Sequence, residues 1–142
     1  MLTLAKQIAR DGEGASRFIE VRVTQARSEE EARIIGRIIA TSPLVKTACY
    51  AGDPNWGRII AALGRAPVQD LDLSKVQCTI GECCVFKNGA VSPDYDETLA
   101  KQAMAGADMV IHIALGMGEM ESVVWTSDLT EEYIKINAEY RT

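Results

Sequence analysis

The spacing of hydrophobic and polar residues predicts strands most clearly at two places. Residues 18–26, FIEVRVTQA, alternate along the chain, with Ile19, Val21 and Val23 on one face and mainly polar residues on the other. A period of two is typical of a strand with one buried and one exposed face, and it favours an antiparallel neighbour. Residues 108–116, DMVIHIALG, are apolar almost throughout, which predicts a buried strand in the centre of the sheet.

Shorter segments complete the predicted sheet. The Asn-Gly pair at 88–89 matches a tight two-residue turn, so the residues around it predict a hairpin. The other segments are short, strand-like runs between turn residues. These segments are 44–52, 76–80, the hairpin at 82–91, and 122–127.

The most regular helical pattern lies in SEEEARIIGRIIATSP, residues 28–43. Ser28 and Glu31 have the spacing of a capping box, and three glutamates occupy the first turn, where the helix dipole favours negative charge. Pro43 is expected to end this helix. The predicted buried stripe consists of Ile34, Ile35, Ile38 and Ile39.

Start and stop signals predict four further helices. Asp53 is the expected N-cap of one, with Pro54 in its first turn and Gly64 just past its end. Asp128 and Glu131 repeat the capping-box spacing before the last helix. The apolar residues of that last helix predict tight packing: Leu129, Tyr133, Ile136 and Tyr140. The other two helices are predicted over residues 4–11 and 93–105.

The order of these elements predicts an α+β (mixed α/β) fold, with a mixed, largely antiparallel sheet and helices packed on it. The chain has 142 residues and shows no repeat, low-complexity stretch or linker. We therefore expect one compact unit over residues 1–142. Within it, residues 1–17 form a loop and edge segment, and residues 18–142 form a sheet-and-helix body.

Composition and charge exclude several functions. No apolar run approaches the ~18 residues that span a bilayer, and the first residues lack the order of a secretion signal. We therefore expect a cytoplasmic protein with no membrane partner. The net charge is −5, and residues 47–142 hold 7 Lys and Arg against 14 Asp and Glu. Such a surface would repel phosphates, so nucleic acid is not an expected partner.

The sequence predicts no metal site and no cofactor. The four cysteines have no C-x-x-C spacing, and we expect buried free thiols at Cys49, Cys78, Cys83 and Cys84. The single histidine, His112, lies in an apolar strand without an adjacent acid or thiol, so we expect a satisfied residue on the sheet.

Other candidate features favour structural interpretations. Gly116 and Gly118 follow a strand, but a phosphate loop would place its third glycine where Glu121 stands, so a tight turn is predicted. Trp56 and Trp125 are expected to anchor the core. No serine lies in a G-x-S-x-G elbow, which argues against that route to hydrolysis.

One carboxylate is unusually bare. In RDGEGASRF, residues 10–18, Glu13 lies between Gly12 and Gly14. Glycines allow positive φ and let another backbone or a ligand approach closely. A structural turn and a ligand contact both explain the pattern.

The last residues raise a similar question. INAEYRT ends directly after a capped helix, whereas chain ends usually fray unless they are held. A terminus held by Tyr140 could bring Asn137 and Thr142 to a fixed place. From residue chemistry alone, the function remains open.

Longer motifs carry a resemblance. The chain contains LAKQIARDGEGASRFIEVRV, SPLVKTACYAGDPNWGRIIAALG and VWTSDLTEEYIKINAEYRT. These motifs and the strands between them resemble the bifunctional ornithine acetyltransferase (glutamate N-acetyltransferase) family of arginine biosynthesis, over nearly all 142 residues. The resemblance implies the C-terminal portion of a DmpA/ornithine-acetyltransferase-like fold.

The resemblance also implies a two-subunit enzyme made by self-cleavage of a precursor. The cut exposes a threonine at the start of the β chain, which takes acetyl from N-acetylornithine and passes it to glutamate. Its own α-amine can activate the hydroxyl, and an oxyanion hole on the α chain stabilises the intermediate. Some members also use acetyl-CoA as a donor, and no other cofactor is implied.

Three substrate-binding residues follow from the family motifs: Glu13 of DGEGA, Asn137, and the terminal Thr142. This makes residues 1–17 the expected substrate-site loop. No catalytic residue is expected in this chain. Family β chains carry several tens of residues between the nucleophilic threonine and RDGEGA, whereas nine residues precede Arg10 here. Thr3 is no substitute, because two residues stand before it.

We therefore expect the C-terminal portion of a β subunit, inactive alone. Its partners would be the α chain, the preceding part of the β chain, and the substrates N-acetylornithine and glutamate. An apolar face near Leu2, Leu4 and Ile8 would favour a homo-oligomer. The alternative is a non-catalytic amino-acid-binding or structural module.

Overall fold

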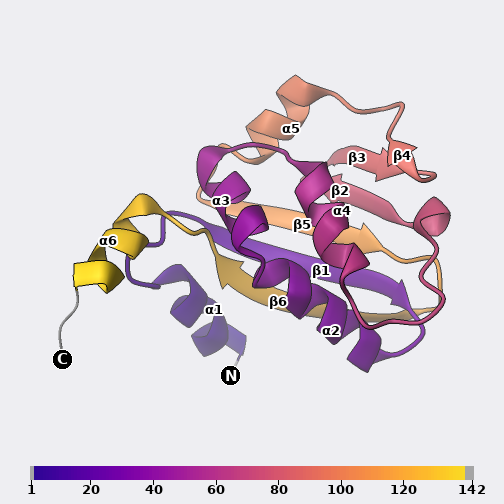
Figure 1. The fold of residues 1–142 in the computed structure, drawn as a ribbon, viewed down its shortest axis with the longest axis horizontal. Coiled ribbons are helices and arrows are strands. Elements are labelled where there is room, and N and C mark those ends of the chain that lie inside the picture. Colours follow the sequence, from indigo (N-terminus) through magenta and orange to yellow (C-terminus); the bar gives the residue numbers. More distant parts are fainter. Residues whose placement is uncertain (1, 140–142) are drawn as a thin grey trace.

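A mixed six-stranded sheet forms the frame of the protein in the computed structural model, which describes residues 2–139 (Figure 1). The strands are β1 (Phe18–Ala26), β2 (Gln77–Ile80), β3 (Cys83–Lys87), β4 (Ala90–Val91), β5 (Asp108–Ala114) and β6 (Met120–Ser127). Their order in the sheet is β4-β3-β2-β5-β1-β6. β1 runs parallel to β5 and antiparallel to β6, and the other described pairs are antiparallel. The predicted fold class, with a largely antiparallel sheet, is confirmed.

Six α-helices pack around this sheet in the described part of the chain. They are α1 (Leu2–Arg10), α2 (Glu29–Ala40), α3 (Pro43–Ala51), α4 (Trp56–Gly64), α5 (Glu97–Ala103) and α6 (Glu131–Glu139), and a 3-10 turn covers Leu73–Lys75. In Figure 1, α2, α3 and α4 lie over one face of the sheet, while α1 packs against β6 and α6 lies beyond one end of the sheet. The helices predicted over 4–11, 28–43, 53–64 and 93–105 are thus present, with shifted ends.

The core lies between the sheet and helices α2 to α4. The predicted alternation of β1 is confirmed, because Ile19, Val21 and Val23 are all buried. Gly36 of α2 sits against β6, where an added Cβ would lie 2.9 Å from Cγ2 of Val124. A small residue at this point lets the helix reach the sheet, and the predicted capping of α2 by the Ser28 side chain is confirmed.

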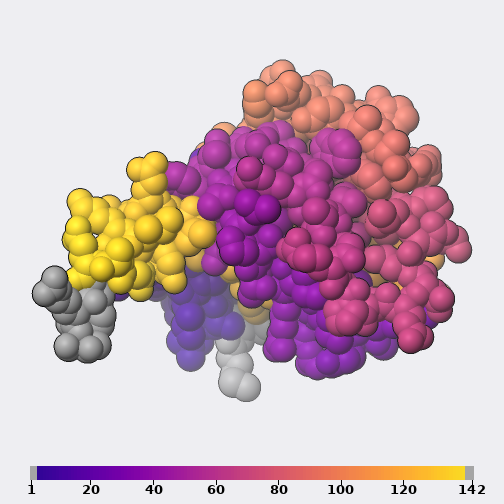
Figure 2. All heavy atoms as spheres, viewed as in Figure 1, coloured from indigo at the N-terminus to yellow at the C-terminus, as the bar shows by residue number. Residues whose placement is uncertain are grey.

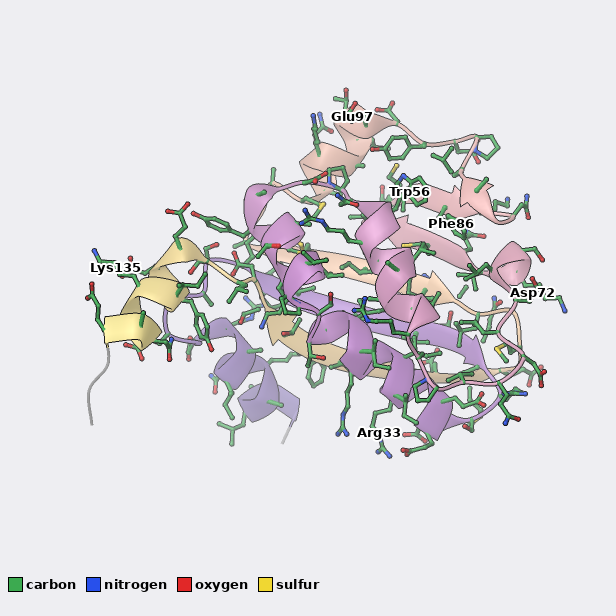
Figure 3. The ribbon with its side chains drawn as sticks, viewed as in Figure 1. Arg33, Trp56, Asp72, Phe86, Glu97 and Lys135 are labelled. Atoms are coloured by element: carbon green, nitrogen blue, oxygen red, sulfur yellow. The ribbon has the colours of Figure 1, made fainter. Side chains whose placement is uncertain are left out.

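The opposite face of the sheet is half-buried and carries both polar and apolar residues. Trp125 lies on this face, and its indole N–H donates a hydrogen bond of 3.1 Å to Glu20 Oε1. The ammonium of Lys6, on α1, lies 5.1 Å from the Trp125 ring centroid. The prediction of Trp125 as a core anchor is therefore wrong. Trp56 does pack on the core, with its ring centroid 5.6 Å from that of Phe86 (Figure 3).

The strand predicted over residues 44–52 is wrong, because these residues form α3. The Ser42 side chain accepts a hydrogen bond from the amide of Val45, Pro43 begins the helix, and Gly52 ends it with a φ of 68°. Ser-Pro at the start and a left-handed glycine at the end are helix signals. They outweigh an apolar run that by itself fits either element.

Other helix boundaries also differ from prediction. The N-cap of α4 is Asn55, whose side chain accepts from the amide of Arg58, and Gly64 is the last helical residue. α5 begins only at Glu97, after Asp96 as N-cap. Pro43 begins α3 directly after Ser42.

The last helix is not packed down tightly as predicted. No residue of α6 within Glu131–Glu139 is buried, and Tyr133 and Ile134 are 44% and 56% exposed. Leu129 and Ile136, also in the predicted stripe, are only partly buried. The fourth residue of the stripe, Tyr140, lies outside the described residues. Figure 2 shows α6 projecting from the body beside α1.

The predicted exposed apolar face near the start of the chain is confirmed at two positions. Leu4 and Ile8 of α1 are 61% and 68% exposed. None of the helices between residues 2 and 139 is both long and apolar enough to cross a membrane.

Candidate functional site

The glycine-flanked loop over residues 11–17 packs directly against the start of α6. Gly14 has a φ of 79°, and a Cβ built on it would lie 2.7 Å from the backbone nitrogen of Tyr133. No larger residue can make this contact without displacing one of the two segments. Gly12 differs, because its nearest neighbour would be an ordinary 3.6 Å away. Gly14 therefore serves a close contact within the chain.

Asp128 ties the same loop to the end of β6. Its side chain is buried, and Oδ1 accepts hydrogen bonds from the amides of Ser16 and Arg17, each at 2.9 Å. The hydroxyl of Ser16 donates to Oδ2. The expected capping box of Asp128 and Glu131 is wrong, because the Asp128 carboxylate binds the loop and not the first turn of α6.

Thr130 supplies the cap of α6 in its place. Its buried hydroxyl accepts a hydrogen bond of 2.9 Å from the amide of Tyr133 and donates to the carbonyl of Gly14. One side chain thus fixes both the beginning of the helix and the loop.

Glu13 stands on this braced loop and faces solvent. The residue is exposed, and its carboxylate makes no hydrogen bond or ion pair with another residue between 2 and 139. The flanking residues are held by backbone contacts, among them the hydrogen bond of 2.9 Å from the amide of Ala15 to the carbonyl of Gly12. The Glu13 carboxylate is therefore accessible to a ligand, while the backbone around it is held by contacts within the chain.

Asn137 lies on α6, one turn after the Tyr133 backbone that meets the loop. It is exposed on α6, and its side-chain amide donates a hydrogen bond of 2.8 Å to the carbonyl of Tyr133, the residue whose backbone meets Gly14. The structure therefore places Glu13 and Asn137 on two segments in contact. The third expected substrate-binding residue, Thr142, lies outside the described residues.

The hollows at this end of the sheet lie beside the loop. One of about 150 Å³ is lined by Arg10, Ala15, Ser16, Arg17, Phe18, Ala107 and Asp108, and one of about 250 Å³ by Ser16, Arg17, Ala105, Gly106 and Ala107. Neither lining includes Glu13 or Asn137. Both hollows are shallow and open to solvent, so the exposed carboxylate is not enclosed by the described part of the chain.

Two arginines lie along these hollows. Arg10 forms an ion pair of 3.0 Å with Asp108, and both side chains are about half exposed. Arg17 donates to the carbonyls of Met104 and Gly106, at 2.5 and 2.9 Å. These bonds join the loop to the segment before β5.

Buried and half-buried titratable groups elsewhere have structural surroundings. Burial, with the nearby charge of Asp128, raises the pKa of the Cys49 thiol to about 12, against an opposing effect of Arg17. Burial and the charge of Arg22 lower the pKa of His112, whose Nε2 lies 2.8 Å from the Thr24 hydroxyl. The expectation of a satisfied histidine on the sheet is confirmed.

The cysteines do not form a reactive group. Cys49, Cys78 and Cys83 are buried, as predicted, whereas Cys84 is only partly buried. Within residues 2–139, no cluster of His, Cys, Asp or Glu has the arrangement of a metal site.

Sequence reasoning missed Asp128 and Thr130 as parts of the site. Asp128 was expected to cap the last helix and Thr130 was not singled out, because nothing in their local spacing indicates residues 14–17 as their partners. One signal was available. Asp128 and Thr130 are both typical N-cap residues, but a helix has only one N-cap, so one of the two side chains must bind elsewhere.

Comparison with known proteins places the chain in a family. The sequence model of the ArgJ family matches residues 1–142. Arginine biosynthesis bifunctional protein ArgJ of Pseudomonas fluorescens (strain Pf0-1) is 47% identical over 141 residues, which cover 99% of this chain and 35% of that protein. The protein of the same name from Ruegeria pomeroyi is 49% identical over 143 residues, which cover 100% of this chain and 35% of that protein.

A solved structure shows the same fold. The crystal structure of Arginine biosynthesis bifunctional protein ArgJ from Bacillus halodurans matches with a TM-score of 0.91 at 39% identity, over 97% of this chain and 64% of that chain.

The fold is α+β with a mixed sheet, and the braced loop at one end of the sheet presents the exposed carboxylate of Glu13. Family and structure agree over nearly the full length. The chain belongs to the ArgJ family. It spans about a third of the length of the curated relatives that it matches.

Proposed function

We propose that this chain forms the substrate-binding part of a glutamate N-acetyltransferase in arginine biosynthesis. In this proposal, a threonine on another polypeptide attacks the acetyl carbonyl of N-acetylornithine, the amide bond breaks, and the ornithine nitrogen leaves with a proton. The α-amine of glutamate then attacks the acetyl-threonine ester, which forms N-acetylglutamate and restores the hydroxyl. Family membership supports the reaction class, since the relatives are named arginine biosynthesis bifunctional proteins.

The lengths of the relatives support a precursor that is cut in two. The aligned region covers 35% of the curated relatives and 64% of the solved chain, so the solved chain is roughly half as long as those relatives. A self-cleaved precursor would give this difference. The proposed partners of this chain are therefore an α chain and the preceding part of a β chain, and the proposal includes acetyl-CoA as a second acetyl donor.

The observation that carries the proposal is the exposed Glu13 on a braced loop. An amino-acid substrate with a cationic amino group is a suitable ligand for a carboxylate that has no described partner. A charge-assisted hydrogen bond of this kind contributes roughly 1.5–3 kcal/mol. The hollows nearby are open to solvent and do not enclose Glu13. In this proposal, the other polypeptides supply the residues that enclose the substrate.

The proposal includes a homo-oligomer and a cytoplasmic location. The exposed Leu4 and Ile8 on α1 support an interface at this helix, because apolar side chains gain by being covered. A biosynthetic enzyme that draws on free glutamate is expected in the cytoplasm.

Replacing Glu13 tests the assignment of the loop. In the assembled enzyme, meaning this chain with the two proposed partner polypeptides, Glu13→Gln should lower kcat/KM for N-acetylornithine by about one to two orders of magnitude, because it removes a charge-assisted bond. Glu97→Gln is the matched control, since Glu97 is an exposed glutamate on α5, distant from α6 in Figure 3. Equal kcat/KM in wild type and Glu13→Gln would remove Glu13 from the site.

Titrating ornithine into the isolated chain separates this proposal from an amino-acid-binding module. An enzyme part should bind only after reconstitution with its partner polypeptides. Saturable binding of ornithine by residues 1–142 alone would favour the module.

A further inference from the structure

Asp128 is a buried carboxylate without a role in the reaction proposed above. It lies at the end of β6, is 3% exposed, and directs all its described hydrogen bonds at residues 16 and 17. A buried charge is tolerated only where several donors satisfy it. Here two backbone amides and one hydroxyl, all from the loop, donate to the Asp128 carboxylate.

The contact continues the ladder between β1 and β6 beyond the strand ends. Phe18 pairs with Ser127 in the sheet, and the amide of Asp128 donates to the carbonyl of Arg17 at 3.3 Å. The Asp128 side chain then reaches one residue further, to Ser16. The loop therefore leaves the sheet in a direction fixed by Asp128.

Thr130 fixes the next point along the loop. Its hydroxyl holds the carbonyl of Gly14, the residue after Glu13, while Gly14 itself rests on the backbone of Tyr133. The segment that follows Glu13 is therefore anchored twice: Thr130 holds Gly14, and Asp128 holds Ser16. The Glu13 side chain is exposed, and the backbone that follows it is held at two points.

We propose that Asp128 is a positioning residue, which sets the place of the Glu13 carboxylate at the substrate through the hydrogen bonds to Ser16 and Arg17. This inference rests on the proposed function. It extends that function by naming Asp128 as the group that holds the loop, next to Thr130, which joins the loop to the helix of Asn137. Asp128 itself is buried and touches no substrate.

The variant Asp128→Asn tests this role in the assembled enzyme. Asparagine keeps one oxygen for the two backbone amides but loses the charge and turns an N–H₂ toward the Ser16 hydroxyl, so the loop should shift. A shift of about 1 Å can cost up to a hundredfold in rate or binding. We expect KM for N-acetylornithine to rise about tenfold, with a smaller change in kcat.

Asp72→Asn is the matched control. The Asp72 side chain makes the same type of contact, accepting from the amide and the hydroxyl of Ser74, but at the end of the molecule away from α6 (Figure 3). It should leave KM unchanged. Thr130→Val, which keeps the shape but removes both hydrogen bonds, serves as a second variant if Asp128→Asn does not fold.

A double-mutant cycle with Glu13→Gln distinguishes positioning from general stability. If Asp128 acts through Glu13, adding Asp128→Asn to Glu13→Gln should change KM by less than about threefold, although each variant alone has a large effect. Independent, multiplying effects on KM, or a lower Tm with KM unchanged, would overturn the inference. If Glu13→Gln alone has no effect, the proposed function fails first, and the two failures are thereby told apart.

Discussion

Gly12 and Gly14 flank the same carboxylate but have different surroundings. Gly14 has positive φ and lies against the Tyr133 backbone, whereas a side chain at Gly12 would meet only ordinary contacts. Of the two interpretations that the sequence left open, the structural turn is confirmed for Gly14, which the fold requires. The ligand contact stays a prediction.

Alanine at these glycines should separate stability from substrate use. Gly14→Ala should lower the free energy of unfolding by about 2 kcal/mol, because it combines a left-handed conformation with a clash. Gly64→Ala, at the end of α4 with nothing within 4 Å of the added Cβ, is the matched control and should not destabilise the protein. Denaturant unfolding measures both.

Gly12→Ala completes this set. It should leave the free energy of unfolding within about 0.5 kcal/mol of wild type, because the added Cβ makes only ordinary contacts. It should lower kcat/KM for N-acetylornithine, because it adds a methyl group next to Glu13. Wild-type stability for Gly14→Ala would contradict the packing of the loop against α6.

Among the elements, those with a clear period or turn signal could be predicted from the sequence. The alternation of β1, the apolar run of β5 and the Asn-Gly turn between β3 and β4 each depend on local chemistry. The prediction for α3 was wrong because residues 44–52 are apolar enough for either element, and the helix-start signals Ser42 and Pro43 lie just before that run. The prediction for α6 was wrong for a different reason. Its apolar spacing predicts a buried face, but the described part of the chain does not bury any residue of this helix.

The exposure of α6 leads to a prediction about its stability. A helix of nine residues without buried side chains has little tertiary support, so its amides should exchange hydrogen faster than those of α2, which packs on β1 and β6. Hydrogen exchange of the isolated chain followed by mass spectrometry measures both helices at once.

The variant Thr130→Val should speed exchange in α6 further, since it removes the cap and the bond to Gly14. The exchange of α2 is the internal control and should not change. Protection of α6 equal to that of α2 in the wild-type chain would show that another contact supports the helix.

At the scale of the whole molecule, the sequence predicted the fold class but not the neighbours in space. The strand order places β6 beside β1, and only this pairing brings Asp128 to residues 16 and 17. Contacts across more than a hundred residues leave no local pattern. The assignment of Glu13 and Asn137 came from family motifs, and the structure adds the contact between their segments. The division into residues 1–17 and a body over 18–142 stays a prediction.

The central claim is that this chain binds the substrate while another polypeptide carries the reactive hydroxyl. Incubating the assembled enzyme with N-acetylornithine in the absence of glutamate should trap the acetyl group on the enzyme. Peptide mass spectrometry after rapid acid quenching then locates the added acetyl mass. We expect it on a threonine of the other polypeptide and on no residue of this chain; an acetyl ester on a hydroxyl of residues 1–142, formed at the rate of turnover, would contradict the account.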